Sequence, residues 1–336
     1  MTRYLNRIWA VVLLAFISCA LWGSAFPMIK IGYGQFGIAD SGAGAKILFA
    51  GVRFIIAGVL AWLAGSLAQK RPLLPEKGRR AADWRRVMLL SLFQTILQYF
   101  FFYLGLANCT GVKSSIINGS GAFVVIILTT LVFRMEKMTW KKLAGCILGF
   151  AGIILINLGG DMSGFAWNGE GFIFMTVLSY AGSTILIKRF TGEGADPVMM
   201  SSLQFVFGGI VLSLLGLLMG GASEQWSFTS TGFGTLMWLS FVSAAAYSLW
   251  AVLLKHNPVS RVAVFGFLNP VCGVLLSALL PRRDRAGVQS ALRRRAGAGV
   301  PGYIHREFRA QHPLKSSPTE KEPQCRNQTT RKCLNP

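Results

Sequence analysis

Nine long apolar stretches, separated by short loops, are the feature of this sequence that most limits what it can fold into. A helix that crosses the hydrocarbon core of a bilayer needs about 20 predominantly apolar residues, and its backbone groups must bond internally. The chain is also only 14% charged, against about 25% in ordinary soluble domains. We therefore predict an all-α integral membrane protein in contact with the lipid bilayer. The predicted spans are residues 8–29, 45–67, 87–106, 114–133, 142–158, 170–188, 197–219, 235–254 and 262–280.

Lysine and arginine are distributed unevenly between the two ends of these spans. Within residues 1–280, 17 of them fall at the N-terminus and in every second junction, whereas the opposite junctions hold only Lys30, Lys46 and Lys113. Because cytoplasmic loops carry the excess of Lys and Arg, we predict a cytoplasmic N-terminus. The formal net charge of +21 does not then indicate nucleic-acid binding, since these charges flank hydrophobic spans.

No constellation of catalytic or metal-binding residues stands out in the sequence. The six cysteines form no Cys-x-x-Cys pair, and the three histidines lack the spacing of metal ligands. No phosphate-binding glycine loop is present, and no Asp or Glu falls deep in a predicted span. We predict no metal, no cofactor and no enzymatic activity, and we see no carboxylate proton relay of the usual kind.

Two stretches in the first half of the chain resemble two stretches in the second half. Residues 22–30 (WGSAFPMIK) align with residues 180–188 (YAGSTILIK), and residues 107–133 align without a gap with residues 254–280. In each pair the two copies are five predicted spans apart. Because five is odd, the second copy crosses the membrane in the opposite sense, which is the inverted-repeat arrangement of many secondary transporters.

A series of short motifs follows in order along residues 8–280. They are Trp22-Gly-Ser with Ile29-Lys30, Arg53-Phe54, Leu131-Val-Phe-Arg-Met-Glu136, the glycines Gly145, Gly149 and Gly152, Ser243-Ala-Ala-Ala-Tyr247-Ser-Leu-Trp250, and Leu268-Asn-Pro-Val271. With these motifs the chain resembles the EamA-type members of the drug/metabolite transporter superfamily. The resemblance implies two inverted five-helix repeats, at residues 8–158 and 169–280, the second without its fifth helix.

The same resemblance implies a function. It is that of a secondary transporter of the inner (plasma) membrane, and specifically an exporter of a small metabolite such as an amino acid, working by alternating access. The substrate, the coupling ion and the oligomeric state, a homodimer included, are left open. Two alternatives are a non-functional truncated transporter product and a membrane sensor or enzyme with a basic tail.

The sequence changes character after Leu280. Residues 281–336 hold 13 Lys and Arg, four acidic residues and no long apolar run, where the family pattern has a tenth helix. A reading-frame change near residue 280 explains this shift better than a native basic tail, which is the alternative. We expect the tail to be disordered, because it has too little apolar surface to offset the entropy of ordering. The missing helix should leave small residues such as Gly273 and Ser277 exposed beside the ninth span.

Arg53 is the one charged residue well inside a predicted span. Placing an arginine at the centre of a spanning helix costs about 2.5–3.5 kcal/mol on insertion scales. One interpretation is a counter-charge for a carboxylate substrate, facing a cavity between the halves. The other is a side chain that extends to the outer interface or bonds backbone carbonyls.

Uncharged polar and aromatic side chains inside the spans are further candidates. Gln94 and Gln98 are four residues apart and therefore share a helix face, which we expect to line the same cavity rather than only bond a neighbouring helix. Trp22 and Tyr247 are candidates for stacking on a substrate. Aromatic residues near span ends more often anchor the helix in the membrane interface, and that alternative stays open.

The fourth and ninth spans carry polar or irregular residues at related positions. Asn118 and Ser120 lie among glycines in the fourth, and Asn269 and Pro270 lie in the ninth. A proline within a helix frees a backbone carbonyl, which is useful for a substrate site or a hinge. Close helix packing through small residues is the alternative.

Overall fold

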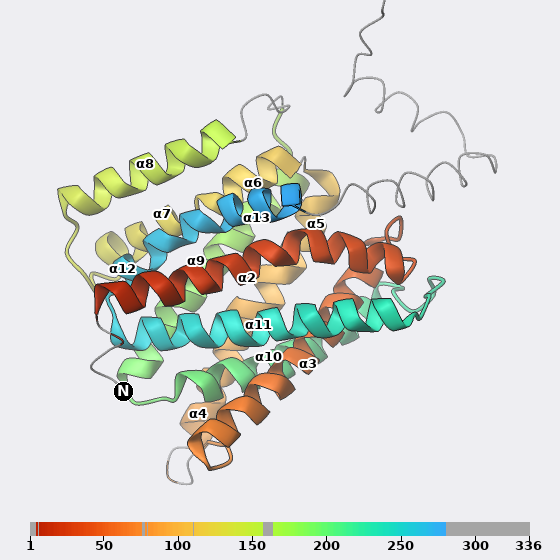
Figure 1. Cartoon of the computed structure of the whole chain (residues 1–336), viewed down its shortest axis with the longest axis horizontal. Helices are drawn as coiled ribbons and strands as arrows, with labels where there is room; N and C mark the ends of the chain where they lie inside the picture. Colours follow the sequence, from red (N-terminus) through yellow and green to blue (C-terminus); the bar gives the residue numbers. More distant parts are fainter. Residues whose placement is uncertain are drawn as a thin grey trace, which may run out of the picture. The chain divides into compact units, whose positions relative to one another are not determined.

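The structure is a computed structural model that describes residues 5, 7–75, 78, 80–109, 111–156 and 164–279. The chain separates into two units, Met1–Asp284 and Arg285–Pro336, and the described residues all lie in the first. They form helices joined by short loops (Figure 1). The long helices are α2 (Ile8–Gln35), α3 (Ala43–Gln69), α4 (Arg80–Ser91), α5 (Gln98–Asn108), α8 (Trp140–Ile156), α9 (Phe172–Gly192), α10 (Pro197–Leu218), α11 (Ser230–His256) and α13 (Leu268–Leu279). The short segments are η1 (Leu92–Leu97), α6 (Gly111–Gly119), α7 (Gly121–Ile127), η2 (Leu128–Val132), η3 (Trp167–Gly171), α12 (Val259–Ala263) and η4 (Val264–Phe267).

Among the described residues, six helical segments are long and apolar enough to cross a membrane. They are α2, α3, α4 continuing through η1 into α5, η3 with α9, α10, and α11. The predicted fourth, fifth and ninth spans are shorter helices, at Ile116–Val132, Trp140–Ile156 and Val259–Gly273. Large apolar side chains such as Leu148 and Leu214 stay exposed, which suits contact with lipid tails. The prediction of an all-α membrane fold is confirmed.

Glycines allow α3 and α10 to cross in close contact. A β-carbon at Gly51 would lie only 2.5 Å from the backbone nitrogen of Ser213. A β-carbon at Gly209 would lie 2.7 Å from the backbone nitrogen of Ile55, and the two glycines also face each other across the crossing. Small residues permit this approach of two backbones, which is a common way to join helices in membranes.

The same two helices touch again on either side of this crossing. A β-carbon at Gly58 would lie 2.7 Å from the nitrogen of Val206, and one at Gly216 would lie 2.5 Å from the nitrogen of Leu48. Residue numbers rise along α3 as they fall along α10, so the helices run antiparallel. Adding 158 to the α3 residue number and subtracting 158 from the α10 residue number converts the contact 51–213 into 209–55, and the contact 58–206 into 216–48. The same offset relates residues 22–30 to residues 180–188. The contacts therefore obey a two-fold rotation, as an inverted repeat requires.

The remaining helix contacts follow the same two-fold relation. The helix α2 packs against α11 and α13, and its counterpart α9 packs against α5 and α7. Figure 1 shows α2 lying along α11, with α13 on its other side. The helix α8 lies at the margin of the bundle and contacts α6, α7, η4 and α13. The fold is thus a repeated helical one whose halves are joined mainly through α2, α3, α10 and α11.

Two helical segments related by the repeat are interrupted at equivalent places. The first changes from α6 to α7 at Ser120, and the second passes through the 3-10 turn η4 before α13 begins. The alignment of residues 107–133 with 254–280 maps Ser120 onto Phe267, the last residue of η4. Pro270 therefore stands in the first turn of α13 rather than inside an uninterrupted helix as we expected. In a first turn its missing N–H leaves no helical hydrogen bond unmade.

The expected gap beside the ninth span is wrong for Gly273. This glycine is buried because α2 packs directly on it, and a β-carbon at Gly23 would lie 2.8 Å from its nitrogen. Small residues on both helices permit that contact. The side chain of Ser277 and the predicted basic tail at residues 281–336 lie outside the described residues.

Candidate functional site

Arg53 lies at the centre of the two-fold relation between α3 and α10. It is midway between Gly51 and Ile55 on α3, and a shift of 158 residues maps it onto Val211, midway along the matching contacts of α10. An axis that relates inverted repeats lies in the membrane plane, near the middle of the bilayer. Arg53 is only 2% exposed, so it lies inside the bundle and not at an interface. One half of the repeat therefore carries a charge that the other half lacks.

Four aromatic rings close a circle beside this arginine, and with Trp22 we call them the aromatic cage. Phe54 of α3 lies 4.5 Å from Tyr99 of α5 and 5.1 Å from Phe205 of α10, measured between ring centroids. The ring of Tyr247, on α11, lies 5.0 Å from that of Phe205, and its hydroxyl lies 2.9 Å from the hydroxyl of Tyr99. Trp22 of α2 lies 5.0 Å from Tyr247. Both halves of the protein thus build the cage.

The guanidinium of Arg53 rests on this cage. Its Cζ atom lies 4.4 Å from the ring centroid of Phe54 and 5.6 Å from that of Tyr99. Such cation–π contacts contribute about 2 kcal/mol when the pair is desolvated. Within the part of the chain that is described, the Nε donor has no hydrogen-bond partner and no ion pair includes Arg53. A buried cation with an unused donor is suited to receive an anionic group.

Gln94 and Gln98 lie on the helix that supplies Tyr99. Gln94 is buried within the π-helical turn η1, and Gln98 is the first residue of α5. The Oε1 atom of each is buried and has no hydrogen-bond partner among the described residues. A buried acceptor without a partner costs about 1–3 kcal/mol, which a donor group on a substrate would offset. Single π-helical turns are frequent at functional sites.

Trp22 and Tyr247 belong to the aromatic cage, so the interface-anchor alternative does not describe them. Asn118 and Ser120, by contrast, donate to carbonyls one turn earlier in their own helix, at 3.0 and 2.6 Å. The Oδ1 atom of Asn269 is buried without a described partner, and Pro270 lies beside it in the chain. The contacts that define the cage include none of these last four residues.

Three members of the cage were not among the candidate site residues predicted from the sequence. Phe54 and Tyr99 directly follow Arg53 and Gln98 in the chain, and Phe205 lies in a long apolar run. In a membrane protein an aromatic residue that faces lipid and one that faces a polar centre look alike in the sequence. Adjacency to a polar candidate was a signal for Phe54 and Tyr99, and Phe205 had none.

Hydrogen bonds and ion pairs join the two halves at the end of the bundle where most Lys and Arg lie, which we call the basic end. Gln69 at the end of α3 donates to Asp196 at the start of α10, over 2.9 Å. Arg86 of α4 pairs with Glu193 after α9, over 2.6 Å. The pKa of Glu193 is lowered, because Arg86 and Arg189 both donate to its carboxylate.

Glu136 makes another link at the basic end. Its carboxylate accepts from both the backbone N–H and the hydroxyl of Ser260, at the start of α12, and pairs with Lys142 over 2.9 Å. Burial opposes ionisation of this carboxyl, but the bonds from Ser260 and Lys142 outweigh burial and lower its pKa below the ordinary value of 4.5. The fourth and ninth helical segments are thus tied together where the sequence motif ending in Glu136 closes the fourth.

The opposite end, which we call the lysine-poor end, has links of its own. Lys113 pairs with Glu170 over 2.8 Å, and both side chains are nearly buried. Thr235 of α11 donates to Gln35 of α2 over 2.7 Å. The aromatic cage therefore lies between two sets of bonds, each joining one half to the other.

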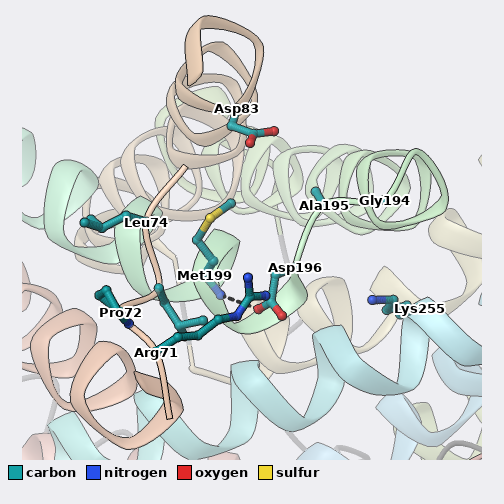
Figure 2. Close-up of a pocket in the computed structure, with 10 residues that line it drawn as sticks. Arg71, Pro72, Leu74, Asp83, Gly194, Ala195, Asp196, Met199 and Lys255 are labelled. Carbon is teal, nitrogen blue, oxygen red and sulfur yellow. Dashed lines mark hydrogen bonds between the residues drawn. The ribbon is translucent and has the colours of Figure 1, made fainter. Parts of the chain in front are cut away.

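A small cavity of about 130 Å³ lies at the basic end (Figure 2). Arg71, Met199 and Lys255 are among the residues that line it. Figure 2 shows Asp196 beside Met199, whose backbone N–H donates to it over 2.9 Å, as does that of Val198. Asp196 is thus already satisfied as the cap of α10, unlike the free groups at the cage. We interpret this cavity as a junction between helices.

A repeated bundle of apolar helices, with a charged residue enclosed at its centre, is typical of the multi-pass membrane proteins that carry solutes. The model of the EamA-like transporter family matches residues 9–158 and 167–284, one stretch in each half. The chain belongs to the EamA-like transporter family.

Several relatives are named as transporters. The chain is 30% identical over 201 residues to an uncharacterized transporter of Archaeoglobus fulgidus, a match that covers 56% of this chain and 65% of the relative. It is 26% identical over 168 residues to the uncharacterized inner membrane transporter YedA of Escherichia coli, covering 47% of this chain and 53% of the relative. The chain thus spans about half to two thirds of the length of these two relatives. A protein of known crystal structure, 16% identical, has the same fold with a TM-score of 0.63 over 88% of this chain and 90% of that one.

Proposed function

We propose that this protein is a secondary transporter of the inner membrane that exports a small metabolite carrying a carboxylate, such as an amino acid. The observation that carries the proposal is Arg53, a cation enclosed at the level of the two-fold axis with an unused donor. A carboxylate bound there would compensate a charge that is costly to bury alone. The aromatic cage would cover the apolar part of the same molecule.

The free acceptors on the helical segment that supplies Tyr99 fit the second charged group of an amino acid. The Oε1 atoms of Gln94 and Gln98 accept hydrogen bonds and have no described donor. An ammonium group supplies three donors and no acceptor. A zwitterion therefore complements an arginine together with two amide oxygens better than a simple anion or a simple amine does.

The mechanism we propose is alternating access between the repeats at residues 8–158 and 169–280. Links such as Gln69–Asp196 at the basic end and Lys113–Glu170 at the lysine-poor end would open in turn. The glycine crossing of α3 with α10 would act as the fulcrum, because its backbones touch at the level of Arg53. Rocking of one repeat against the other around a central site is the general behaviour of inverted-repeat transporters.

The test is export from cells that produce the full chain. The medium and cell contents are compared by mass spectrometry for a panel of amino acids and other carboxylates, with cells lacking the chain as reference. Arg53→Gln should lower export of the transported compound about tenfold to hundredfold, since hydrogen bonds to a charged group contribute about 1.5–3 kcal/mol. Arg189→Gln is the matched control, because the Arg189 side chain is 70% exposed.

Two results would overturn the proposal. One is an Arg53→Gln protein that exports at the rate and half-saturation of the native chain. The other is a native chain, present in the membrane at the amount of the variants, that changes no compound of the panel.

A further inference from the structure

Of the three lysines at the lysine-poor end, Lys46 is the one without a settled role. Lys30 is exposed, and Lys113 is paired with Glu170 over 2.8 Å. Lys46 is half-buried, its Nζ lies 5.8 Å from the ring centroid of Tyr33, and none of the ion pairs among the described residues includes it. A half-buried ammonium that lies against an aromatic ring can still bind an anion.

Lys46 and Arg53 belong to one face of α3. They are seven residues apart, which is about two helical turns and about 10 Å along the axis. Tyr33 and Tyr103 connect the two levels. Tyr33 packs with Tyr103 in one hydrophobic cluster, and the ring of Tyr103 lies 6.4 Å from that of Tyr99 in the cage. The hydroxyls of Tyr33 and Tyr103 are both buried next to each other, and neither forms a well-aligned hydrogen bond with a described residue.

We infer that Lys46 and the hydroxyls of Tyr33 and Tyr103 form a second anion-binding position, on the route between Arg53 and the lysine-poor end. The inference rests on the proposed function and deepens it, because it makes the transported species an anion or a zwitterion led by its carboxylate. Two positions about 10 Å apart let a carboxylate move in steps, and conduction needs sites that are favourable enough to enter and weak enough to leave. Two cations on one route also disfavour cationic solutes.

The test measures how strongly the route attracts an anion, and it does not require the substrate to be known. The six cysteines are replaced in the full chain, and Tyr103→Cys places a single thiol between the two cations. In membrane vesicles the thiol reacts with a negatively charged and with a positively charged methanethiosulfonate. The ratio of the two rates reports the local potential. A second thiol, from Tyr33→Cys, repeats the measurement should the first variant fold poorly.

Lys46→Gln should lower the ratio of anionic to cationic rates about tenfold, because one removed charge acts on the two reagents in opposite directions at short range. Lys46→Arg should keep the ratio, and Lys30→Gln, the matched exposed lysine, should leave it unchanged. Raising the salt concentration should reduce the native ratio only weakly, since partly buried charges are poorly screened.

The outcomes separate this inference from the function on which it rests. An unchanged ratio in Lys46→Gln overturns the second position, and so does a thiol at both positions that neither reagent reaches. A ratio that falls in Lys46→Gln but not in Arg53→Gln supports the second position and contradicts the role of Arg53 in the proposed function. A fall in both variants supports the route as a whole.

Discussion

Replacing Gly51 with alanine should push α3 and α10 apart and destabilise the protein. The new β-carbon would lie 2.5 Å from the nitrogen of Ser213 and 2.8 Å from the carbonyl oxygen of Gly209. Ordinary van der Waals contact begins at 3.4 Å, so the helices must separate by about 0.9 Å at this point. Both contacts are with backbone atoms, and a change of side-chain rotamer cannot relieve them.

The expected magnitude follows from two opposing terms. Overpacking a tight contact typically costs about 1–3 kcal/mol. Alanine gains about 0.5–1 kcal/mol over glycine inside a helix, so the net loss should lie between about 0 and 2.5 kcal/mol, centred near 1 kcal/mol. Gly145→Ala on α8 is the matched control. No atom lies within 4 Å of a β-carbon there, so this variant keeps the helix gain alone.

The two-fold relation makes a sharper prediction for the pair. Gly209→Ala should cost about as much as Gly51→Ala, and the double variant should cost clearly less than the two together, because one separation of the helices relieves both clashes. Denaturant titration of the purified chain in detergent gives the free energy of unfolding of each of the three variants. Additive costs, or a Gly51→Ala protein as stable as Gly145→Ala, would refute the argument for a shared crossing.

Three further predictions concern the ends of the bundle. Reporter fusions after residues 75 and 225 should report opposite sides of the membrane, and the same side for both would contradict the topology. Because the pKa of Glu136 is lowered in the folded protein, this carboxylate contributes fully to stability at a pH above its ordinary pKa. The contribution is lost as the pH falls through the lowered pKa, so Glu136→Gln should reduce the loss of stability that the native chain shows at acid pH. Lys188→Met should cost about 1–2 kcal/mol in the same unfolding assay, because the Lys188 ammonium donates to the carbonyls that end α11, over 2.8 and 2.9 Å. Its repeat equivalent Lys30 is exposed, and Lys30→Met should be neutral; equal losses would remove the capping role.

The helices and the repeat could be predicted from the sequence because both leave recognisable patterns of hydrophobicity. Long apolar runs need no partner to be recognised as helices, and a two-fold relation leaves similar residues at a fixed offset. The offset of 158 residues was present in residues 22–30 and 180–188, yet its larger consequence, the matching glycines of α3 and α10, became visible only through their contacts. Glycine is common in membrane helices, and a single sequence does not say which glycine meets which.

The candidate site was predicted in part. Arg53 stood out because a charge in a span is expensive, and Gln94 followed from the same reasoning. Trp22 and Tyr247 of the cage were among the candidates, but Phe54, Tyr99 and Phe205 were missed, because the sequence does not show whether an aromatic ring faces lipid or another ring. Asn118 was expected at the site but bonds within its own helix, since the backbone of an interrupted helix offers nearby carbonyls to any short polar side chain.

The charge at the centre of the repeat has an electrical consequence. In the proposed cycle Arg53 barely moves, but it is connected to the cytoplasm in one state and to the outside in the other, so the membrane potential acts on it as if it had crossed. One elementary charge crossing 100 mV corresponds to about 2.3 kcal/mol. An interior-negative potential therefore draws the empty protein toward the state open to the cytoplasm. A bound anion cancels the charge and the bias with it, so voltage resets the empty carrier for another anion from inside and favours export. A zwitterion has no net charge, so its binding leaves the bias in place in the loaded carrier as well.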